Sequence, residues 1–413
     1  MNQTTIKPQS RAEKSDSRSP GGYRLFRRMI LKSLSKFKSG QLHYEDWEEK
    51  HTFGSPDPEF EVTLKVHNKH FFTAVIFGGS LGAAESYIRG DWECDDLTKL
   101  FRLFIKNQSR MNDIERTLAG LSRLRDRIFN RLTKNTIAGS KRNILAHYDL
   151  SNEFYQLWLD PTLTYSSGVF NSDESSMEEA SLEKLKRMCD LVDLQPEDHL
   201  LEIGTGWGSL SMYAVQNYGC RVTTTTISDK QYELATQRIS EAGLANKITV
   251  IQEDYRNLSG QFDKVISIEM IEAVGHEFIP DFVRTLDRVT RPGGKIAIQG
   301  ITINDQIYDN YRHSVDFIKK YIFPGGNLLS ITYFLESIAR VSTLRPTHLS
   351  EIGLHYARTL QHWRKSFESV LPQVRELGFD EPFIRLWRYY LTYCEAGFLE
   401  KHIGDVQLGF EKL

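Results

Sequence analysis

The chain has 413 residues, of which 40% are hydrophobic, 26% charged and 11% aromatic. This composition is typical of a globular protein with two or three domains and excludes a disordered chain, a collagen and a disulfide mini-protein. The 52 basic and 54 acidic residues leave a net charge of −2, which argues against nucleic acid bound through overall positive charge.

The N-terminal segment is polar and then basic. Residues 1–22 are rich in Ser, Lys and Arg, which predicts a disordered leader. No acidic residue occurs from Ser17 to Tyr44, and apolar residues within Arg24–Lys38 recur at near-helical spacing. This pattern predicts a basic amphipathic helix that either packs on a core or docks on an anionic membrane. The residues expected to face such a membrane are Phe26, Arg27, Arg28, Ile30, Lys32, Lys36 and Phe37.

The following segments predict a small α+β domain. Residues 60–78 have the pattern of a β-hairpin, in which Val62, Leu64 and Val66 alternate before the apolar run Phe71–Phe77. Residues 95–135 have a helical pattern, with charges interleaved among leucines. We therefore expect a lipid- or membrane-associating domain over residues 23–135 and a linker over 136–145, where Gly, Lys and Asn interrupt the pattern.

From about residue 175, strand patterns alternate with amphipathic helices near 206–218, 228–243 and 276–290. The expected strands are His199–Ile203, Arg221–Ile227, Lys247–Gln252, Lys264–Ile268 and Lys295–Ile301. A βαβ series of this kind predicts an α/β domain with a parallel sheet and right-handed crossovers. We place this domain at residues 146–413. Residues 303–375 show no strand rhythm and are expected to cap the sheet, before a helix near 382–400 and a last strand, Val406–Glu411.

A glycine-rich loop follows the first of these strands. Gly204, Gly206 and Gly208 lie between the strand and a helix, where backbone N–H groups can approach a ligand closely. Dinucleotide enzymes prefer G-x-G-x-x-G, whereas the spacing here is G-x-G-x-G. Asp254 ends the third strand and can accept a hydrogen bond from an adenine amino group, with a helix cap or turn residue as the less favoured alternative. The arrangement resembles class I S-adenosylmethionine-dependent methyltransferases.

The resemblance narrows at His147–Tyr155 and Leu159–Gly168, which are similar to the signature segment of the cyclopropane-fatty-acyl-phospholipid and mycolic acid cyclopropane synthases. Further similar segments are Glu202–Gly208, Thr225–Ser228, Glu269–Gly275, Tyr321–Gly326, His355–Trp363 and Leu81–Trp92. The resemblance runs from about residue 60 to the end. It implies a Rossmann-like class I methyltransferase domain with a mostly parallel seven-stranded sheet and a helical cap.

Membership of this family implies transfer of the methyl carbon of S-adenosylmethionine to the double bond of an unsaturated acyl chain in a phospholipid, which forms a cyclopropane ring. It also implies a bound bicarbonate ion as the base. Glu272 matches the glutamate that holds this ion, Tyr356 matches the tyrosine that hydrogen-bonds it, and the Ile301 backbone N–H is a further donor.

Three positions depart from the family pattern. Ser167 stands where the bacterial enzymes have a cysteine, Gln299 where they have a histidine, and Ala273 where a histidine usually follows Glu272. A hydroxyl and an amide can both donate to an anion, so Ser167 and Gln299 remain candidates for the ion site. The departures affect the ring-closing step, which uses the ion, more than the methylation.

The expected contacts of S-adenosylmethionine are Tyr148, Tyr165, Ser166, Gly204, Gly206, Gln231 and Asp254, and no metal site is expected. A relative that stops at a methyl or methylene branch, or methylates a small amine, is the nearest alternative. A lipid-surface binding protein with a disused pocket is the alternative from another class. The absence of a signal-peptide core and of an apolar run near the ~20 residues that span a bilayer predicts a cytoplasmic enzyme, peripherally bound to the inner face of the membrane. The sequence leaves open whether it forms a homodimer.

Overall fold

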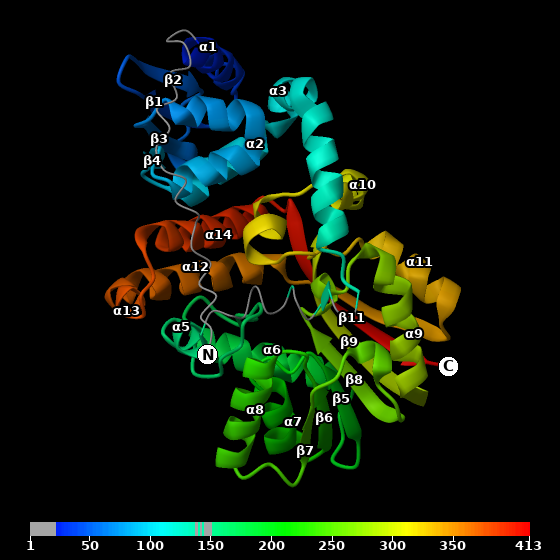
Figure 1. Cartoon of the computed structure of the whole chain (residues 1–413). Helices are drawn as coiled ribbons and strands as arrows, with labels where there is room; N and C mark the ends of the chain where they lie inside the picture. Colours follow the sequence, from blue (N-terminus) through cyan, green and yellow to red (C-terminus); the bar gives the residue numbers. More distant parts are fainter. Residues whose placement is uncertain (1–21, 137–138, 141–142, 144–150) are drawn as a thin grey trace.

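The computed structural model describes residues 22–136, 139–140, 143 and 151–413. A small α+β domain at the N-terminus is followed by a larger α/β domain (Figure 1). The leader expected over residues 1–22, apart from Gly22, lies outside the described residues, and so does part of the linker expected over 136–145.

The N-terminal domain contains one four-stranded sheet with strand order β2-β1-β3-β4. Its elements are α1 (Gly22–Leu34), β1 (Gln41–Glu45), β2 (Lys50–Gly54), β3 (Glu61–Val66), α2 (His70–Ile88), β4 (Trp92–Cys94) and α3 (Leu97–Leu132). The long helix predicted over residues 95–135 is therefore confirmed as α3. Asp96 caps its N-terminus by accepting a hydrogen bond from the Lys99 N–H.

The hairpin predicted over residues 60–78 is wrong in its second half. Strand β3 forms as expected, but the run Phe71–Phe77 belongs to helix α2, whose Phe72 and Ile76 are buried. A short, continuously apolar run fits a buried helix as well as a strand, so its periodicity does not distinguish between the two. From the sequence we expected no segment long and apolar enough to cross a membrane, but α2 is one by length and composition. The core helix of a globular protein can have the same length and composition.

Helix α1 forms the predicted basic amphipathic helix, but several residues expected to face a membrane are buried. Ile30 is 5% exposed and Phe37 is 4% exposed, and both belong to the domain core. The Arg27 guanidinium Nε lies 2.6 Å from Asp46 Oδ2, in an ion pair that is almost closed to solvent. These three side chains therefore stabilise the domain and are unavailable to lipid.

The larger domain contains a seven-stranded sheet with order β10-β11-β9-β8-β5-β6-β7, in which β11 alone runs antiparallel to its two neighbours. The strands are β5 (His199–Ile203), β6 (Arg221–Thr225), β7 (Ile248–Ile251), β8 (Phe262–Ile268), β9 (Thr290–Ile303), β10 (Leu344–Glu351) and β11 (Ile403–Lys412). The main helices are α6 (Met177–Leu191), α7 (Ser209–Tyr218), α8 (Asp229–Glu241), α9 (Ile279–Val289), α10 (Asp305–His313), α11 (Ile331–Val341), α12 (Gly353–Ser369) and α14 (Glu381–Leu399). The predicted α/β class and the mostly parallel sheet are confirmed.

Residues 303–375 differ from the strandless cap that the sequence predicts. Strand β10 lies within them and forms one edge of the sheet, where it pairs with β11. Its sequence is polar because most of its side chains are exposed, so the apolar signal of a strand is missing. Helix α11 packs against α9. Only part of 303–375, including α10 and the turn Ile318–Ile322, borders the site described below.

The two domains share one hydrophobic core. It runs from the N-terminal sheet through α3 into α12 and α14, which lie side by side between the N-terminal domain and the seven-stranded sheet (Figure 1). Phe101 on α3 meets Tyr389 on α14 edge to face, with ring centroids 4.8 Å apart. This packing fixes the N-terminal domain over the side of the sheet where the parallel strands end.

Candidate active site

The glycine loop after β5 borders a large cavity. Gly204, Gly206 and Gly208 all have positive φ angles, of 104°, 52° and 87°. A Cβ on Gly206 would meet no atom within 4 Å, so the backbone there faces open space. The left-handed backbone requires glycine, and the loop leads directly into the N-terminus of α7.

Most of the predicted cofactor residues lie around the same cavity. Its lining includes Tyr165, Ser166, Gly204, Gly206, Gln231 and Asp254. Both carboxylate oxygens of Asp254 accept hydrogen bonds from the Arg256 guanidinium, each at 2.7 Å. The Gln231 amide oxygen accepts from the Thr226 hydroxyl at 2.9 Å, which fixes the side chain. Tyr148 lies outside the described residues.

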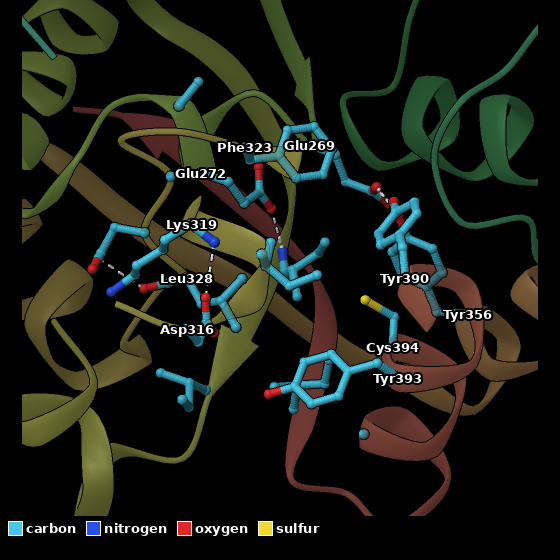
Figure 2. Close-up of a pocket in the computed structure, with 18 of the residues that line it drawn as sticks. Glu269, Glu272, Asp316, Lys319, Phe323, Leu328, Tyr356, Tyr390, Tyr393 and Cys394 are labelled. Carbon is cyan, nitrogen blue, oxygen red and sulfur yellow. Dashed lines mark hydrogen bonds between the residues drawn. The ribbon is translucent and has the colours of Figure 1, made fainter. Parts of the chain in front are cut away.

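A glutamate that the sequence analysis assigned no role lies at the centre of the polar site. Glu269 follows β8 and adopts a left-handed backbone with φ of 46°, a strained conformation that is concentrated at functional sites. Its Oε1 accepts hydrogen bonds from the Ser167 N–H and from Gln299 Nε2, both at 2.8 Å. Its Oε2 accepts from the Tyr356 hydroxyl at 2.7 Å. Figure 2 shows Tyr356 and Tyr390 beside this carboxylate.

Glu272 lies nearby on the same wall of the cavity. Its Oε1 accepts a hydrogen bond from the Ile301 backbone N–H, and its Oε2 is buried without a hydrogen-bond partner among the described residues. Burial, and then the neighbouring Glu269, raise the pKa of Glu272 to about 8, so it is mostly protonated at neutral pH. Glu272, Tyr356 and Ile301 all line this cavity, and the Ile301 N–H is directed at Glu272.

Two further buried ionisable side chains surround Glu269. Lys184 on α6 is 1% exposed and donates to the Ser166 hydroxyl at 2.7 Å. Burial lowers the pKa of Lys184 to about 8, against the opposing effect of the acids around it. Asp405 on β11 is fully buried, and its Oδ2 accepts from Gln299 Nε2 at 3.1 Å. Burial raises the pKa of Glu269 above its usual value, while its hydrogen-bond donors and Lys184 oppose the rise.

The hydrogen-bond donors expected to bind bicarbonate already donate to other groups of the protein. The Ser167 N–H, the Gln299 amide and the Tyr356 hydroxyl all point to Glu269, and the Ile301 N–H points to Glu272. The Ser167 hydroxyl donates instead to the Gly168 carbonyl, at 2.9 Å. A bicarbonate ion would have to displace a buried carboxylate of the same charge. The residues present therefore do not fit this ion.

The cavity is continuous from the glycine loop to the N-terminal domain and has a volume of about 1240 Å³. Glu269, Glu272 and Tyr356 lie along it, followed by aromatic residues of α14 that include Tyr390 and Tyr393 (Figure 2). Beyond these, its lining is mainly apolar side chains of the N-terminal domain. They include Leu64, Phe71, Val75, Leu100, Phe101, Phe104 and Ile105.

Sequence reasoning missed Glu269, Lys184 and Asp405. For Glu269 a signal was present, because the carboxyl ends of parallel strands are where ligands bind in such sheets, and Glu269 directly follows β8. Lys184 and Asp405 gave no signal, since a lone lysine in a helix and a lone aspartate in a strand read as ordinary surface residues.

Comparisons with known proteins agree with the fold. The family model for mycolic acid cyclopropane synthetase matches residues 136–408. The tuberculostearic acid methyltransferase UfaA1 of Mycobacterium tuberculosis is 36% identical over 336 residues, which are 80% of this chain and 78% of that protein. The cyclopropane-fatty-acyl-phospholipid synthase of Escherichia coli is 34% identical over 358 residues, 84% and 87% of the two chains.

The solved structure of the mycolic acid cyclopropane synthase CmaA1 complexed with SAH and CTAB is also similar. The two structures superpose with a TM-score of 0.62 at 30% sequence identity, and the match covers 66% of this chain and 98% of the CmaA1 chain. The range matched by the family model spans the glycine loop, Glu269, Glu272 and Tyr356. The chain belongs to the mycolic acid cyclopropane synthetase family.

Proposed function

We propose that this protein transfers the methyl carbon of S-adenosylmethionine to the double bond of an unsaturated acyl chain of a phospholipid and then forms a cyclopropane ring. The observation that carries the proposal is the cavity, which joins a glycine loop, a buried carboxylate and an apolar channel in one space. A cofactor and a long apolar chain can therefore meet beside Glu269.

The residues at one end of the cavity fit S-adenosylmethionine. Gly204 and Gly206 offer backbone without a side chain of their own, and polar groups are offered by Gln231 in the first turn of α8 and by Asp254 after β7. When bound, this cofactor supplies an electrophilic methyl group. Tyr165 also lines the cavity, and its ring is stacked on Trp363 with ring centroids 5.1 Å apart.

The apolar end fits an acyl chain, because its lining offers aromatic and aliphatic side chains and few polar groups. When an alkene carbon takes the methyl group, the π electrons form the new C–C bond and the neighbouring carbon is left with a positive charge. The electron pair of the broken methyl–sulfur bond would leave with the sulfur, as S-adenosylhomocysteine. Water would add to this cation, so the reaction needs a dry site. Tyr356 and Tyr390 can face the cation with the negative surfaces of their rings.

In the proposed reaction, Glu269 acts as the base that completes it. Its carboxylate lines the cavity, and it occupies the donors that would otherwise bind an external ion. It removes a proton from the transferred methyl group, and the electrons of that C–H bond close the ring on the cationic carbon. Because burial raises the pKa of Glu269, it is a stronger base than an exposed glutamate.

A methylene-branched product is the second candidate. A hydride shift from the methylated carbon to its cationic neighbour would move the charge, and loss of a methyl proton to Glu269 would then give a C=CH₂ group. One observation favours the methylene branch. Glu269, a fixed side chain, holds the hydrogen-bond donors that the family resemblance assigned to a mobile bicarbonate ion. The similarity to a tuberculostearic acid methyltransferase points the same way.

We further propose that the enzyme works at the cytoplasmic face of the membrane, with α1 against anionic lipid. Arg24, Arg28 and Lys32 are exposed on this helix, and Leu25 is 56% exposed. Phe77 of α2, which is 60% exposed, lies next to α1 through an edge-to-face contact with Phe26. Each basic residue near such a surface contributes on the order of 1 kcal/mol before screening by salt.

Methyl transfer is tested with S-adenosylmethionine labelled in its methyl group. We expect label in unsaturated phospholipid and none in saturated phospholipid, and equal labelling of both would refute the alkene chemistry. NMR of the product separates a cyclopropane from a methylene branch, which have the same mass.

The membrane proposal needs a separate comparison. The variant Arg28→Ser/Lys32→Ser should lose activity on anionic vesicles and keep it on detergent-dispersed lipid. The matched control is Arg340→Ser/Lys365→Ser, which removes two exposed charges from α11 and α12. Equal losses on both substrates would show that α1 acts only in packing.

A further inference from the structure

The buried side chain of Asp405 has an unusual position for a carboxyl group. It is fully buried on β11, behind Glu269, and is not among the residues that line the cavity. Its Oδ1 has no hydrogen-bond partner among the described residues. A buried acceptor of this kind is costly, and a native structure usually has a reason for it.

The neighbouring amides fix the arrangement of the two carboxyl groups. The Gln299 amide oxygen accepts from Gln407 Nε2 at 3.0 Å, so Nε2 of Gln299 must point the other way. There it donates to Glu269 Oε1 at 2.8 Å and to Asp405 Oδ2 at 3.1 Å. One amide group therefore holds both carboxyl groups close together in a dry interior.

Two adjacent carboxylates cannot both be ionised in such a place. Among the described residues, the Glu269 side chain receives three hydrogen bonds, from Ser167, Gln299 and Tyr356, whereas the Asp405 side chain receives only the shared bond from Gln299. The negative charge is thus better stabilised on Glu269. The proton belongs on Asp405, where it converts an unsatisfied acceptor into a donor.

We propose that Asp405 is a positioning residue that carries a proton at neutral pH and donates it in a hydrogen bond to Glu269. This inference rests on the proposed role of Glu269 as the base. Asp405 keeps the Glu269 carboxylate ionised and turned toward the cavity. When Glu269 takes the substrate proton, both carboxyl groups become neutral.

The other ionisable groups around this pair are consistent with the assignment. They are Glu272 from the turn after β8, Lys184 from α6, Tyr356 from α12 and Tyr390 from α14. Burial, and then Glu269 and Glu272, raise the pKa of Asp405 well above its usual value, with Lys184 opposing. The pKa values of both tyrosines are raised, so neither carries charge at neutral pH.

Infrared spectroscopy of the full-length protein tests where the proton lies, independently of any activity. Protein labelled with ¹³C at the aspartate carboxyl should show at pH 7 a protonated-carboxyl band that shifts with the label. The band from Asp405 should disappear in Asp405→Asn and remain in Asp316→Asn, which removes another aspartate whose pKa is raised by desolvation. A band unchanged in Asp405→Asn would overturn the proposal. If Asp405→Asn does not fold, Asp405→Ser serves for the same comparison.

The pH profile of methyl transfer gives a second, signed readout. If Asp405 is protonated in the wild type, Asp405→Asn replaces its hydrogen bond to Glu269 by the weaker one of an amide. The acid limb of the pH profile should then stay in place or move to higher pH by up to about one unit. An ionised Asp405 would repel Glu269, and its removal would move the acid limb down by about one unit or more. A downward shift would therefore overturn the proposal, and an inactive wild type would count against the proposed function alone.

Discussion

Replacement of Glu269 by glutamine removes the proposed base at almost constant volume. The amide cannot take a proton from the substrate, and its NH₂ group cannot accept the hydrogen bonds that Oε1 or Oε2 accepts from Ser167, Gln299 and Tyr356. Loss of a general base lowers turnover by about 10²–10⁴-fold. At 1.36 kcal/mol per tenfold, the barrier rises by roughly 2.7–5.4 kcal/mol.

The measurement is single-turnover transfer of labelled methyl to unsaturated phospholipid at saturating cofactor. Cofactor affinity, measured by calorimetry, should change little, since Glu269 lies beyond the glycine loop. The loss of a buried hydrogen bond should lower the free energy of unfolding by about 1–3 kcal/mol. The control is Glu376→Gln, which makes the same chemical change at an exposed position of α13 (Leu371–Glu376) and should behave as wild type.

A second variant asks whether Glu269 replaces an external ion. Glu269→Gly vacates the space between the Ser167 N–H, Gln299 and Tyr356, and added bicarbonate should then restore part of the lost activity. Wild-type activity should not respond to bicarbonate. The reasoning is refuted if the wild type requires bicarbonate, or if Glu269→Gln keeps full turnover.

Three further outcomes follow from the structure. Lys184→Met removes the buried cation that lowers the pKa of Glu269, so the acid limb of the pH profile should move to higher pH, as a pH–rate series would show. Gly206→Val places a side chain on a left-handed backbone at the cavity and should weaken cofactor binding more than tenfold by calorimetry. Arg27→Met leaves the buried Asp46 carboxylate unpaired and should lower the free energy of unfolding by about 3 kcal/mol in denaturant titrations. Burial alone would raise the pKa of Asp46, but hydrogen bonds, led by the one from Arg27, lower it to about 2. The wild type should therefore lose the stability that this ion pair contributes only as the pH falls from about 4 toward 2.

Local sequence determined the α/β domain to a large extent. Strand β5 has the predicted bounds, His199–Ile203, because its apolar run is followed at once by the glycine loop. The glycines themselves were informative, since a backbone with positive φ at three alternate positions tolerates little else. Patterns of this kind act over a few residues, so they can be seen without knowledge of the fold.

The errors occurred where burial depends on distant parts of the chain. The run Phe71–Phe77 became a helix because the N-terminal core surrounds it, which periodicity does not reveal. Strand β10 was missed because an exposed edge strand needs no apolar pattern and is held by pairing with β11. Arg27 resembled a membrane-facing charge until Asp46, from another segment, was placed against it.

The sequence, through its family resemblance, predicted the positions of Glu272 and Tyr356, and its departures at Ser167 and Gln299 already marked the ion site as altered. What fills that site was decided only by the tertiary structure. The left-handed turn at Glu269 directs its carboxylate to Ser167, 102 residues away, and the antiparallel strand β11 places Asp405 behind it. A sequence specifies which groups are present, whereas the pairing of buried charges depends on how strands and helices distant in the chain pack together.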